Sequence, residues 1–282
     1  MSTRIALIGA GGKMGCRVTD NFLKSSYVVD YIEVSVQGIE NLRSRGVQVV
    51  AEDPAVGAAD VVILAVPDVL MGEIAARVIP PMRAGALLMT LDPAAPLDGQ
   101  LPLTGSIGCV VAHPCHPSVF NWEPTETAFR DFYGGISARQ AVVCALMQGS
   151  EAQYDLGVEI ASAMFAPVSR VHRVTLEQMA MLEPALVETL AQTCMEAVKE
   201  GHDRLVEAGV PAAAVRDFVL GHLRIQIAVL FGEVNGTFSD AAYKISRRAK
   251  AVIFKDNWQR IFEASDIREQ VRDITIRDVT PR

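Results

Sequence analysis

Two histidines follow an apolar run in the stretch VVAHPCHPSVF, residues 110–120. The run is typical of a buried strand, and His113 stands at its carboxyl end, which is where ligands bind in open parallel sheets. We therefore expect His113 to take part in the chemistry, as a proton acceptor or as a metal ligand. His116 either joins it there or supports it. The grouping does not match a structural zinc site, which needs two separated ligand pairs.

A second candidate is a carboxylate among the apolar residues of a predicted helix. Glu183 falls inside an apolar stripe, whereas Glu177 and Glu188 fall outside it. An unpaired carboxylate on a buried face is destabilising, so it needs an ionic partner, a metal or a proton. Pro184 follows directly and disfavours regular helix. Two interpretations stay open: a kink that turns Glu183 into a cleft, or a structural ion pair with an arginine. The stripe comprises Leu176, Met179, Ala180, Leu186, Val187, Leu190, Ala191 and Cys194.

The remaining reactive side chains predict no further chemistry. His222 lies between Phe218 and Ile225, so we expect a core histidine whose ring nitrogens have partners. A nucleophile-based hydrolase finds no support, because the chain has no Gly-x-Ser-x-Gly motif. The cysteines number five and form no Cys-x-x-Cys pair, which predicts a reduced, cytoplasmic protein.

Glycines crowd the start of the chain, in the stretch IALIGAGGKMG at residues 5–15. They follow a predicted strand and precede a predicted helix, with the spacing Gly9-x-Gly11-x-x-x-Gly15 or Gly9-x-x-Gly12-x-x-Gly15. Glycines in this context allow a tight turn and the close approach of a pyrophosphate to the helix N-terminus. We expect a bound dinucleotide that is lined by Gly11, Gly12, Lys13 and Met14.

Three other strand ends belong to the same predicted site. Glu33 ends the next strand, where a carboxylate would accept hydrogen bonds from a ribose 2′-hydroxyl and repel a 2′-phosphate, so NAD is favoured over NADP. Val66, Pro67 and Asp68 end another strand, and Asp92 ends the one after it. We expect Val66 and Pro67 to line the nicotinamide side of the cofactor.

The elements that must position these residues fall into two parts. Up to residue 174, short apolar runs alternate with helical stretches, which predicts an α/β domain with a Rossmann-type, doubly wound parallel sheet. Residues 175–282 read as helices only, to about Gly209, from Pro211 to Gly236 and again beyond Ser239. This all-α part is too apolar to stand alone in water. We expect it to bind substrate and to form an intertwined homodimer.

Charge and hydropathy exclude two classes of partner. The formal net charge of −7 argues against general nucleic-acid binding, and the longest apolar runs are too short to span a bilayer. The predicted strand at Ile5 leaves no room for a signal peptide. Residues 244–282 nevertheless hold ten Lys and Arg against six acids. This basic segment is either a solvated helix surface or an attractor of small anions.

The Gly-rich turn with KMG, the ILAVP strand and the change to helices resemble the 6-phosphogluconate dehydrogenase-like superfamily of NAD(P)-dependent dehydrogenases. The superfamily includes β-hydroxyacid dehydrogenases, whose catalytic Lys and Asn correspond here to Glu183 and Val187. That departure argues against their mechanism. The His-Pro pair after a core strand resembles prephenate dehydrogenases, in which the histidine polarises the substrate hydroxyl, and His113 matches it.

AHPCHPSVF, LEPALVETLAQT and VIFKDNW resemble most closely the D-apionate oxidoisomerases, NAD-dependent enzymes of branched sugar-acid catabolism. The resemblance implies that a hydroxyl is oxidised, that hydride passes to NAD, and that a carboxylate-bearing group migrates to give 3-oxo-isoapionate. Two roles for the candidate residues stay open. His113 and Glu183, one from each domain, hold a divalent metal such as Zn, Mg or Mn. Alternatively His113 is a general base, and a protonated Glu183 orients the substrate.

Two rival functions stay open beside this one. The first is a β-hydroxyacid or prephenate-type dehydrogenase without migration. The second is a non-catalytic NAD sensor, which would tolerate the loss of His113 and Glu183. For an enzyme acting on a sugar acid, Lys244, Lys250 and Lys255 are candidates for binding the substrate carboxylate, from the same subunit or from its partner.

Overall fold

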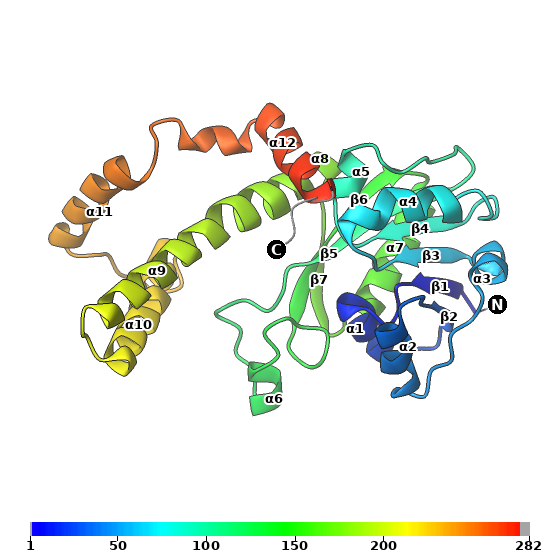
Figure 1. Ribbon diagram of the computed structural model, residues 1–282, viewed down its shortest axis with the longest axis horizontal. Helices are drawn as coiled ribbons and strands as arrows, with labels where there is room; N and C mark the ends of the chain where they lie inside the picture. Colours follow the sequence, from blue (N-terminus) through cyan, green and yellow to red (C-terminus); the bar gives the residue numbers. More distant parts are fainter. Residues whose placement is uncertain (1, 277–282) are drawn as a thin grey trace. The chain divides into compact units, whose positions relative to one another are not determined.

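The computed structural model describes residues 2–276, and the rest of the basic C-terminal segment, residues 277–282, lies outside the described residues (Figure 1). The chain divides into two compact units. The first comprises the described residues up to Glu183 together with those from Arg268 onward, and the second comprises Pro184–Ile267. The sequence predicts the boundary at residue 174 instead. The difference arises because the helix after this point packs its Leu176 and Met179 on the sheet residues Val143 and Ala145.

A single sheet of seven strands forms the centre of the first unit, in the order β2-β1-β3-β4-β5-β6-β7. Neighbouring strands from β2 to β5 run parallel, as expected, but β6 runs antiparallel to β5, and β7 follows β6 in parallel. A parallel neighbour needs a crossover helix, and the β5–β6 connection contains only the short helix α6, Glu126–Phe129. The strands are β1 Arg4–Ile8, β2 Val28–Ile32, β3 Val61–Leu64, β4 Leu87–Thr90, β5 Gly108–Pro114, β6 Gln140–Gln148 and β7 Val168–Arg173.

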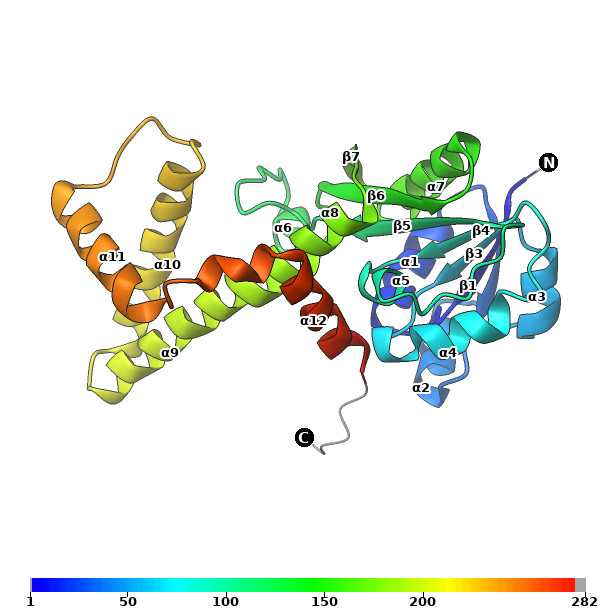
Figure 2. The ribbon, with the colours of Figure 1, turned by 90° about the horizontal axis from the view of Figure 1, so that it is seen from above.

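Helices cover both faces of this sheet because successive strand residues point to opposite sides (Figures 1 and 2). Ile5 and Leu7 of β1 pack with helices α1 and α7, whereas Ala6 and Ile8 pack with α3, α4 and α5. The predicted doubly wound α/β architecture is therefore confirmed. The helix bounds are α1 Lys13–Phe22, α2 Val36–Arg43, α3 Glu52–Ala58, α4 Asp68–Val78, α5 Ala94–Leu97 and α7 Glu151–Met164.

The helix that carries Glu183 changes its geometry at Met181, shortly before Pro184. It begins as α8, Leu176–Ala180, where Thr175 and Gln178 form a capping box. It continues as a π-helical segment, Met181–Gln192, and then as α9, Thr193–Glu207. Pro184 has no N–H to donate and lies inside the π-helical segment, so the departure from regular helix that Pro184 predicts is observed as a change of helix type from Met181 onward.

Helices alone make up the second unit, as the sequence predicts: α9, α10 Ala212–Leu230, α11 Asp240–Ile253 and a 3₁₀ turn at Trp258–Phe262. The first residues of α12, Ala264–Thr275, follow. Within this unit only Pro184, Ala185, Val215 and Ile267 are buried. The expected burial of the stripe after Glu183 is wrong for this chain on its own, since Leu186 and Val187 are exposed. Among residues 2–276, no helix is long and apolar enough to cross a membrane.

Candidate active site

The glycine turn between β1 and α1 is packed tightly against the protein's own backbone. A Cβ on Gly11 would lie 2.1 Å from the Gly38 carbonyl oxygen of α2, and a Cβ on Gly15 would lie 2.0 Å from the Gly9 carbonyl oxygen. Gly9 itself has a φ of +78°. These glycines are thus required by the turn itself. The backbone N–H groups of the first turn of α1, which include those of Lys13 and Met14, lack i−4 partners within the helix, as at any helix N-terminus.

Glu33 follows the end of β2 and reaches back to this turn. One carboxylate oxygen accepts the N–H of Gly11 at 3.0 Å, and the other accepts those of Val34 and Ser35 at 2.9 and 2.8 Å. The structure therefore places Glu33 beside the predicted dinucleotide turn. Val66 lies against Gly9, and Pro67 caps the start of α4, so the predicted cofactor-lining residues gather at the same strand ends.

The His113 ring is oriented by the end of the neighbouring strand. Its Nδ1 lies 2.7 Å from the Leu91 carbonyl oxygen, which can only accept a hydrogen bond. The proton is therefore on Nδ1, and the lone pair of a neutral ring is on Nε2. Nε2 faces the Glu183 carboxylate, with 3.3 Å to Oε2. Both side chains are largely buried, at 16% and 22% exposure, so this nitrogen and this oxygen need a shared proton or a cation.

Asp92 adds a second carboxylate at this point. It follows β4, the strand next to β5 in the sheet, and its Oδ2 lies 4.0 Å from His113 Nδ1. Its other oxygen accepts the N–H of Ala94 at 2.8 Å, which fixes the side chain. One donor atom each from Asp92, His113 and Glu183 lie within 4.8 Å of one another. All three residues belong to the first compact unit, so the expectation that His113 and Glu183 come from two different domains is wrong.

These three side chains suit a divalent metal. An imidazole nitrogen with two carboxylates is a donor set for zinc, manganese or iron, and its two hard oxygen ligands also fit calcium or magnesium. Two ligands that are each about 2.1 Å from one ion lie roughly 3 Å apart, which is close to the 3.3 Å between Nε2 and Oε2. The sequence predicts Asp92 beside the cofactor but not as a third donor. The available signal was that β4 and β5 both end in polar residues.

The other candidate residues lie outside the cluster of Asp92, His113 and Glu183, some beside it and some in the second unit. His116 is next to His113, with 6.4 Å between the ring centroids, and its Nδ1 lies 2.8 Å from the Tyr133 carbonyl oxygen. His222 is on α10 in the second unit, exposed and bonded to the Phe218 carbonyl oxygen, so the expectation of a core histidine is wrong. Lys244 and Lys250 are on α11, and Lys255 follows that helix.

The Cys115 thiol lies close enough to Glu183 for the carboxylate to affect its pKa. It follows β5 directly and is a free thiol whose sulfur is partly covered by its neighbours, although the residue as a whole is exposed. Burial of the sulfur, and after it the negative charge of Glu183, raises the pKa of the Cys115 thiol. The carboxylate therefore influences a second reactive group, which offers a probe of its charge.

Comparison with known proteins identifies the family. The C-terminal family model of phosphogluconate dehydrogenase (decarboxylating) matches residues 121–275. The D-apionate oxidoisomerase of Cupriavidus necator is 46% identical over 98% of this chain and 100% of that protein. This chain belongs to the D-apionate oxidoisomerase family. A second D-apionate oxidoisomerase, from Rhizobium rhizogenes, is 44% identical over 97% of this chain and 100% of its own length.

A solved structure is also similar to this chain. A semialdehyde dehydrogenase NAD-binding protein from Cupriavidus necator, solved in complex with calcium and NAD, is 46% identical, with a TM-score of 0.95. The similarity covers 98% of this chain and 100% of that one. Membership in the D-apionate oxidoisomerase family confirms the resemblance that AHPCHPSVF, LEPALVETLAQT and VIFKDNW indicate.

Proposed function

We propose that this chain is an NAD-dependent oxidoreductase that oxidises a hydroxyl of D-apionate and couples the oxidation to a carbon migration that gives 3-oxo-isoapionate. The observation that carries the proposal is the buried pair of His113 Nε2 and Glu183 Oε2, 3.3 Å apart beside the end of β5. The full-length relatives named D-apionate oxidoisomerase support the choice of substrate. The related structure with NAD, together with Glu33 at the glycine turn, supports the choice of cofactor.

His113 is the natural proton acceptor for the oxidation. Its Nδ1–H is held by the Leu91 carbonyl, so Nε2 can take the proton of a substrate hydroxyl while hydride leaves the same carbon for NAD. In the isomerisation, a carbon substituent leaves the neighbouring hydroxyl-bearing carbon for the new carbonyl carbon. The hydroxyl left behind gives up its proton and becomes a carbonyl, while the oxygen of the first carbonyl takes up a proton and becomes a hydroxyl. A base and a group that orients both oxygens are sufficient for these steps.

Glu183 and Asp92 are the orienting groups. Where His113 Nε2 joins them as a ligand instead of acting as the base, the three side chains would hold a divalent cation, and such a cation when bound polarises a carbonyl and its neighbouring oxygens. Without a cation, a protonated Glu183 would donate a hydrogen bond to the substrate. The calcium complex of the related structure supports the first role.

One experiment separates these possibilities. NADH formation is measured at neutral pH with D-apionate, linear aldonates, a linear 3-hydroxy acid and prephenate, each with and without a chelator. Turnover that is confined to D-apionate and lost with the chelator is the expected result. Turnover on a linear 3-hydroxy acid that ignores the chelator would favour a plain dehydrogenase without migration. Silence on every acid, with NAD still bound, would favour a non-catalytic NAD sensor.

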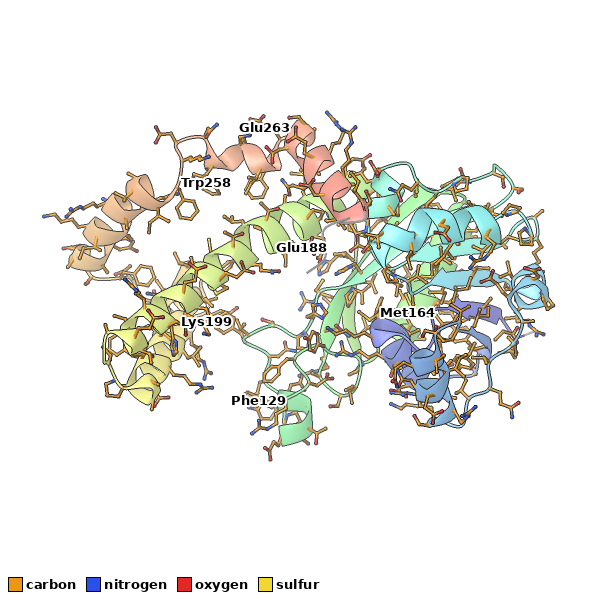
Figure 3. All side chains as sticks on the ribbon, in the orientation of Figure 1. Phe129, Met164, Glu188, Lys199, Trp258 and Glu263 are labelled. Atoms are coloured by element: carbon orange, nitrogen blue, oxygen red, sulfur yellow. The ribbon has the colours of Figure 1, made fainter. Side chains whose placement is uncertain are left out.

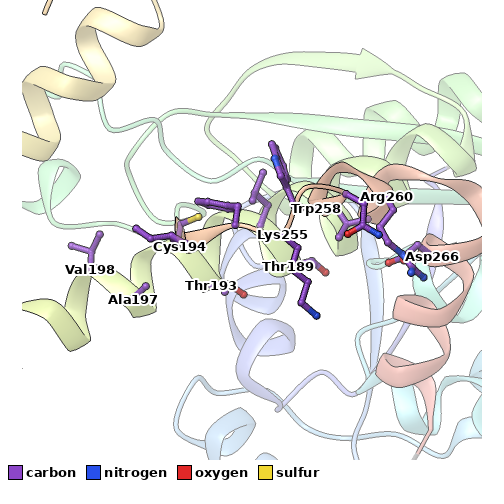
Figure 4. A pocket seen from close by; sticks show the side chains of 14 residues that line it. Thr189, Thr193, Cys194, Ala197, Val198, Lys255, Trp258, Arg260 and Asp266 are labelled. Atoms are coloured by element: carbon purple, nitrogen blue, oxygen red, sulfur yellow. The ribbon is translucent and has the colours of Figure 1, made fainter. Parts of the chain in front are cut away.

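We further propose a homodimer formed through the helical unit. The few buried residues of Pro184–Ile267 leave many apolar side chains in water, among them Phe218, Leu230 and Phe231. Lys199 and Trp258 mark this unit in Figure 3. It also contains an apolar cavity of about 770 Å³, with Thr193, Cys194 and Val198 on one wall and Lys255, Trp258 and Arg260 on the other (Figure 4). A helix of a second copy would cover such surfaces.

The composition of the chain supports the proposed compartment and the proposed class of partner. The five cysteines are all free, which supports the proposed cytoplasmic location. The acidic net charge of −7 supports a small-molecule substrate and not a nucleic acid as the partner.

A further inference from the structure

The segment between β5 and β6, residues 115–139, is a loop that is held by internal hydrogen bonds and packs against α1. The Asp131 carboxylate is buried and accepts the N–H groups of Ile136, Ser137 and Ala138 at 3.0, 2.9 and 3.1 Å. The buried Asn21 side chain of α1 donates to the Gly135 carbonyl oxygen at 2.9 Å. These bonds fix the loop against the helix that begins at the glycine turn.

Tyr133 in this loop lies against two cations of α1. Arg17 Cζ is 4.3 Å from the centroid of the Tyr133 ring, and Lys13 Nζ is 5.4 Å from it. The two residues are four positions apart and so share one face of the helix. Helical side chains lean toward the N-terminus, which directs Arg17 toward the turn where Lys13 begins the helix. Among residues 2–276, neither cation has a carboxylate partner.

The same tyrosine is connected to the catalytic end of the site. Its carbonyl oxygen lies 2.8 Å from His116 Nδ1, and its ring meets the His116 ring edge-on at 6.1 Å. His116 has a φ of +60°, in the left-handed region that disfavours a side chain, and it is the only such non-glycine among the described residues. Strain of this kind persists where surrounding contacts over-determine it, as they do here, and it concentrates at functional sites.

We propose that Arg17 binds the pyrophosphate of the dinucleotide together with Lys13, and that Tyr133 is the positioning residue that holds Arg17 in place. This inference rests on the proposed use of NAD. A pyrophosphate at the N-terminus of α1 would meet backbone N–H groups first. Two cations without carboxylate partners, held on one aromatic ring beside that turn, supply the compensating charge. Because Tyr133 also holds His116, one loop ties the phosphate end of the cofactor site to His113.

The first test measures binding and not turnover. Dissociation constants of NAD, ADP-ribose and adenosine are determined for wild type, Arg17→Gln and the control Lys24→Gln, which removes one positive charge just beyond the far end of α1. Arg17→Gln should weaken NAD and ADP-ribose about tenfold or more and leave adenosine within about twofold. Lys24→Gln should change none of the three. Equal affinity of wild type and Arg17→Gln for ADP-ribose would overturn the proposal.

Tyr133 variants test the positioning role. Tyr133→Leu should weaken NAD binding as much as Arg17→Gln does, and the double variant should be no weaker than either single variant. Tyr133→Phe keeps the ring and should stay within about twofold of wild type. The positioning role would be refuted if the losses of NAD affinity added in the double variant, or if the Tyr133→Leu protein bound NAD as wild type does. Thermal unfolding of each variant separates misfolding from lost affinity.

The two proposals fail in different ways. A wild-type protein that binds NAD and ADP-ribose but leaves D-apionate unchanged contradicts the proposed reaction and leaves the Arg17 comparison valid. A wild-type protein that binds neither nucleotide contradicts the proposed cofactor, and the pyrophosphate subsite with it.

Discussion

The backbone carbonyl of Leu91 decides which nitrogen of His113 is available for chemistry. It accepts a hydrogen bond from Nδ1–H, with 2.7 Å between nitrogen and oxygen, so Nε2 faces Glu183. Neither residue type specifies a reaction by itself, since histidines and glutamates are common in ion pairs. Their exclusion from water, together with the fixed tautomer, makes the pair a candidate for proton transfer or metal binding.

Removing the Glu183 charge should abolish turnover without abolishing cofactor binding. We expect Glu183→Gln to lower the rate of NADH formation from D-apionate by about a hundredfold or more, because a neutral amide neither binds a cation strongly nor exchanges a proton. The dissociation constant of NAD should stay within about twofold. Steady-state kinetics and a binding titration check the two parts.

Glu177→Gln is the matched control, because Glu177 is exposed on α8 and lies outside the cluster. A Glu183→Gln enzyme with wild-type kcat would remove Glu183 from the mechanism. Equal loss in both variants would instead indicate a general effect of charge on this helix.

The alkylation of Cys115 should report the charge on Glu183. The raised pKa of its thiol leaves little thiolate at neutral pH, so iodoacetamide should react slowly and then faster with each step to higher pH until the pKa is reached. Glu183→Gln removes one cause of the shift and should speed the reaction at pH 7. Burial raises the pKa of Cys109 and Cys144 to about 12, so both should remain unmodified.

Peptide mass spectrometry after timed alkylation follows each thiol separately. A Cys115 rate that is identical in wild type and Glu183→Gln would show that Glu183 carries no charge near this thiol.

At the scale of elements, the glycine turn lies so close to α2 that no side chain should fit at Gly11. We expect Gly11→Ala to destabilise the fold by about 2 kcal/mol and to weaken NAD binding, because its Cβ would lie 2.1 Å from the Gly38 carbonyl oxygen and the two elements must separate. Denaturant unfolding and a cofactor titration measure the two effects.

Gly57→Ala in α3 serves as the control within the same unit. The nearest atom to its Cβ would be the Pro81 carbonyl oxygen at 3.8 Å, an ordinary contact, so the exchange should be neutral or slightly stabilising. If Gly11→Ala bound NAD as wild type does, close packing at this turn would not matter for the cofactor.

The sequence predicts the strands and helices of the α/β unit well, because apolar runs bounded by Gly and Pro are strong local signals. It does not predict the direction of β6. That direction depends on how residues 115–139 fold, and their clamps, such as Asp131 with three N–H groups, are not visible as a pattern. The local signals for Glu183 and Pro184 are real, but whether a helix changes type there depends on packing.

The site is predictable where it follows from strand ends. His113 is the clearest case, since it lies at the end of an apolar run. Asp92 joins it only because β4 and β5 are neighbours, and strand order is a property of the whole sheet. The placement of Tyr133 over Arg17 joins positions far apart in the chain, and a single sequence contains no signal for it.

At the scale of the whole molecule, the exposed apolar surface of the helical unit should be covered by a second copy. We expect wild type to have twice the 30.4 kDa mass of one chain, and its melting temperature to rise with protein concentration. Leu230→Glu, at a side chain that is 69% exposed, should shift the mass toward that of one chain. Light scattering after size exclusion measures the mass.

Leu23→Glu makes the same exchange at an exposed leucine of the α/β unit and should leave the mass unchanged. A wild-type protein that stays at 30.4 kDa across the micromolar range would contradict the proposed dimer.

The three backbone bonds of Glu33 have a consequence for how this lineage can change its coenzyme. A shift toward a phosphorylated ribose requires the carboxylate to go, yet the same two oxygens hold the N–H groups of Gly11, Val34 and Ser35. A single substitution of Glu33 would therefore make room for the 2′-phosphate but also remove the hydrogen bonds that hold the turn. Other hydrogen-bond acceptors for these N–H groups must be in place before Glu33 is replaced. Coenzyme preference should therefore change slowly in evolution and should not be reversed by one substitution.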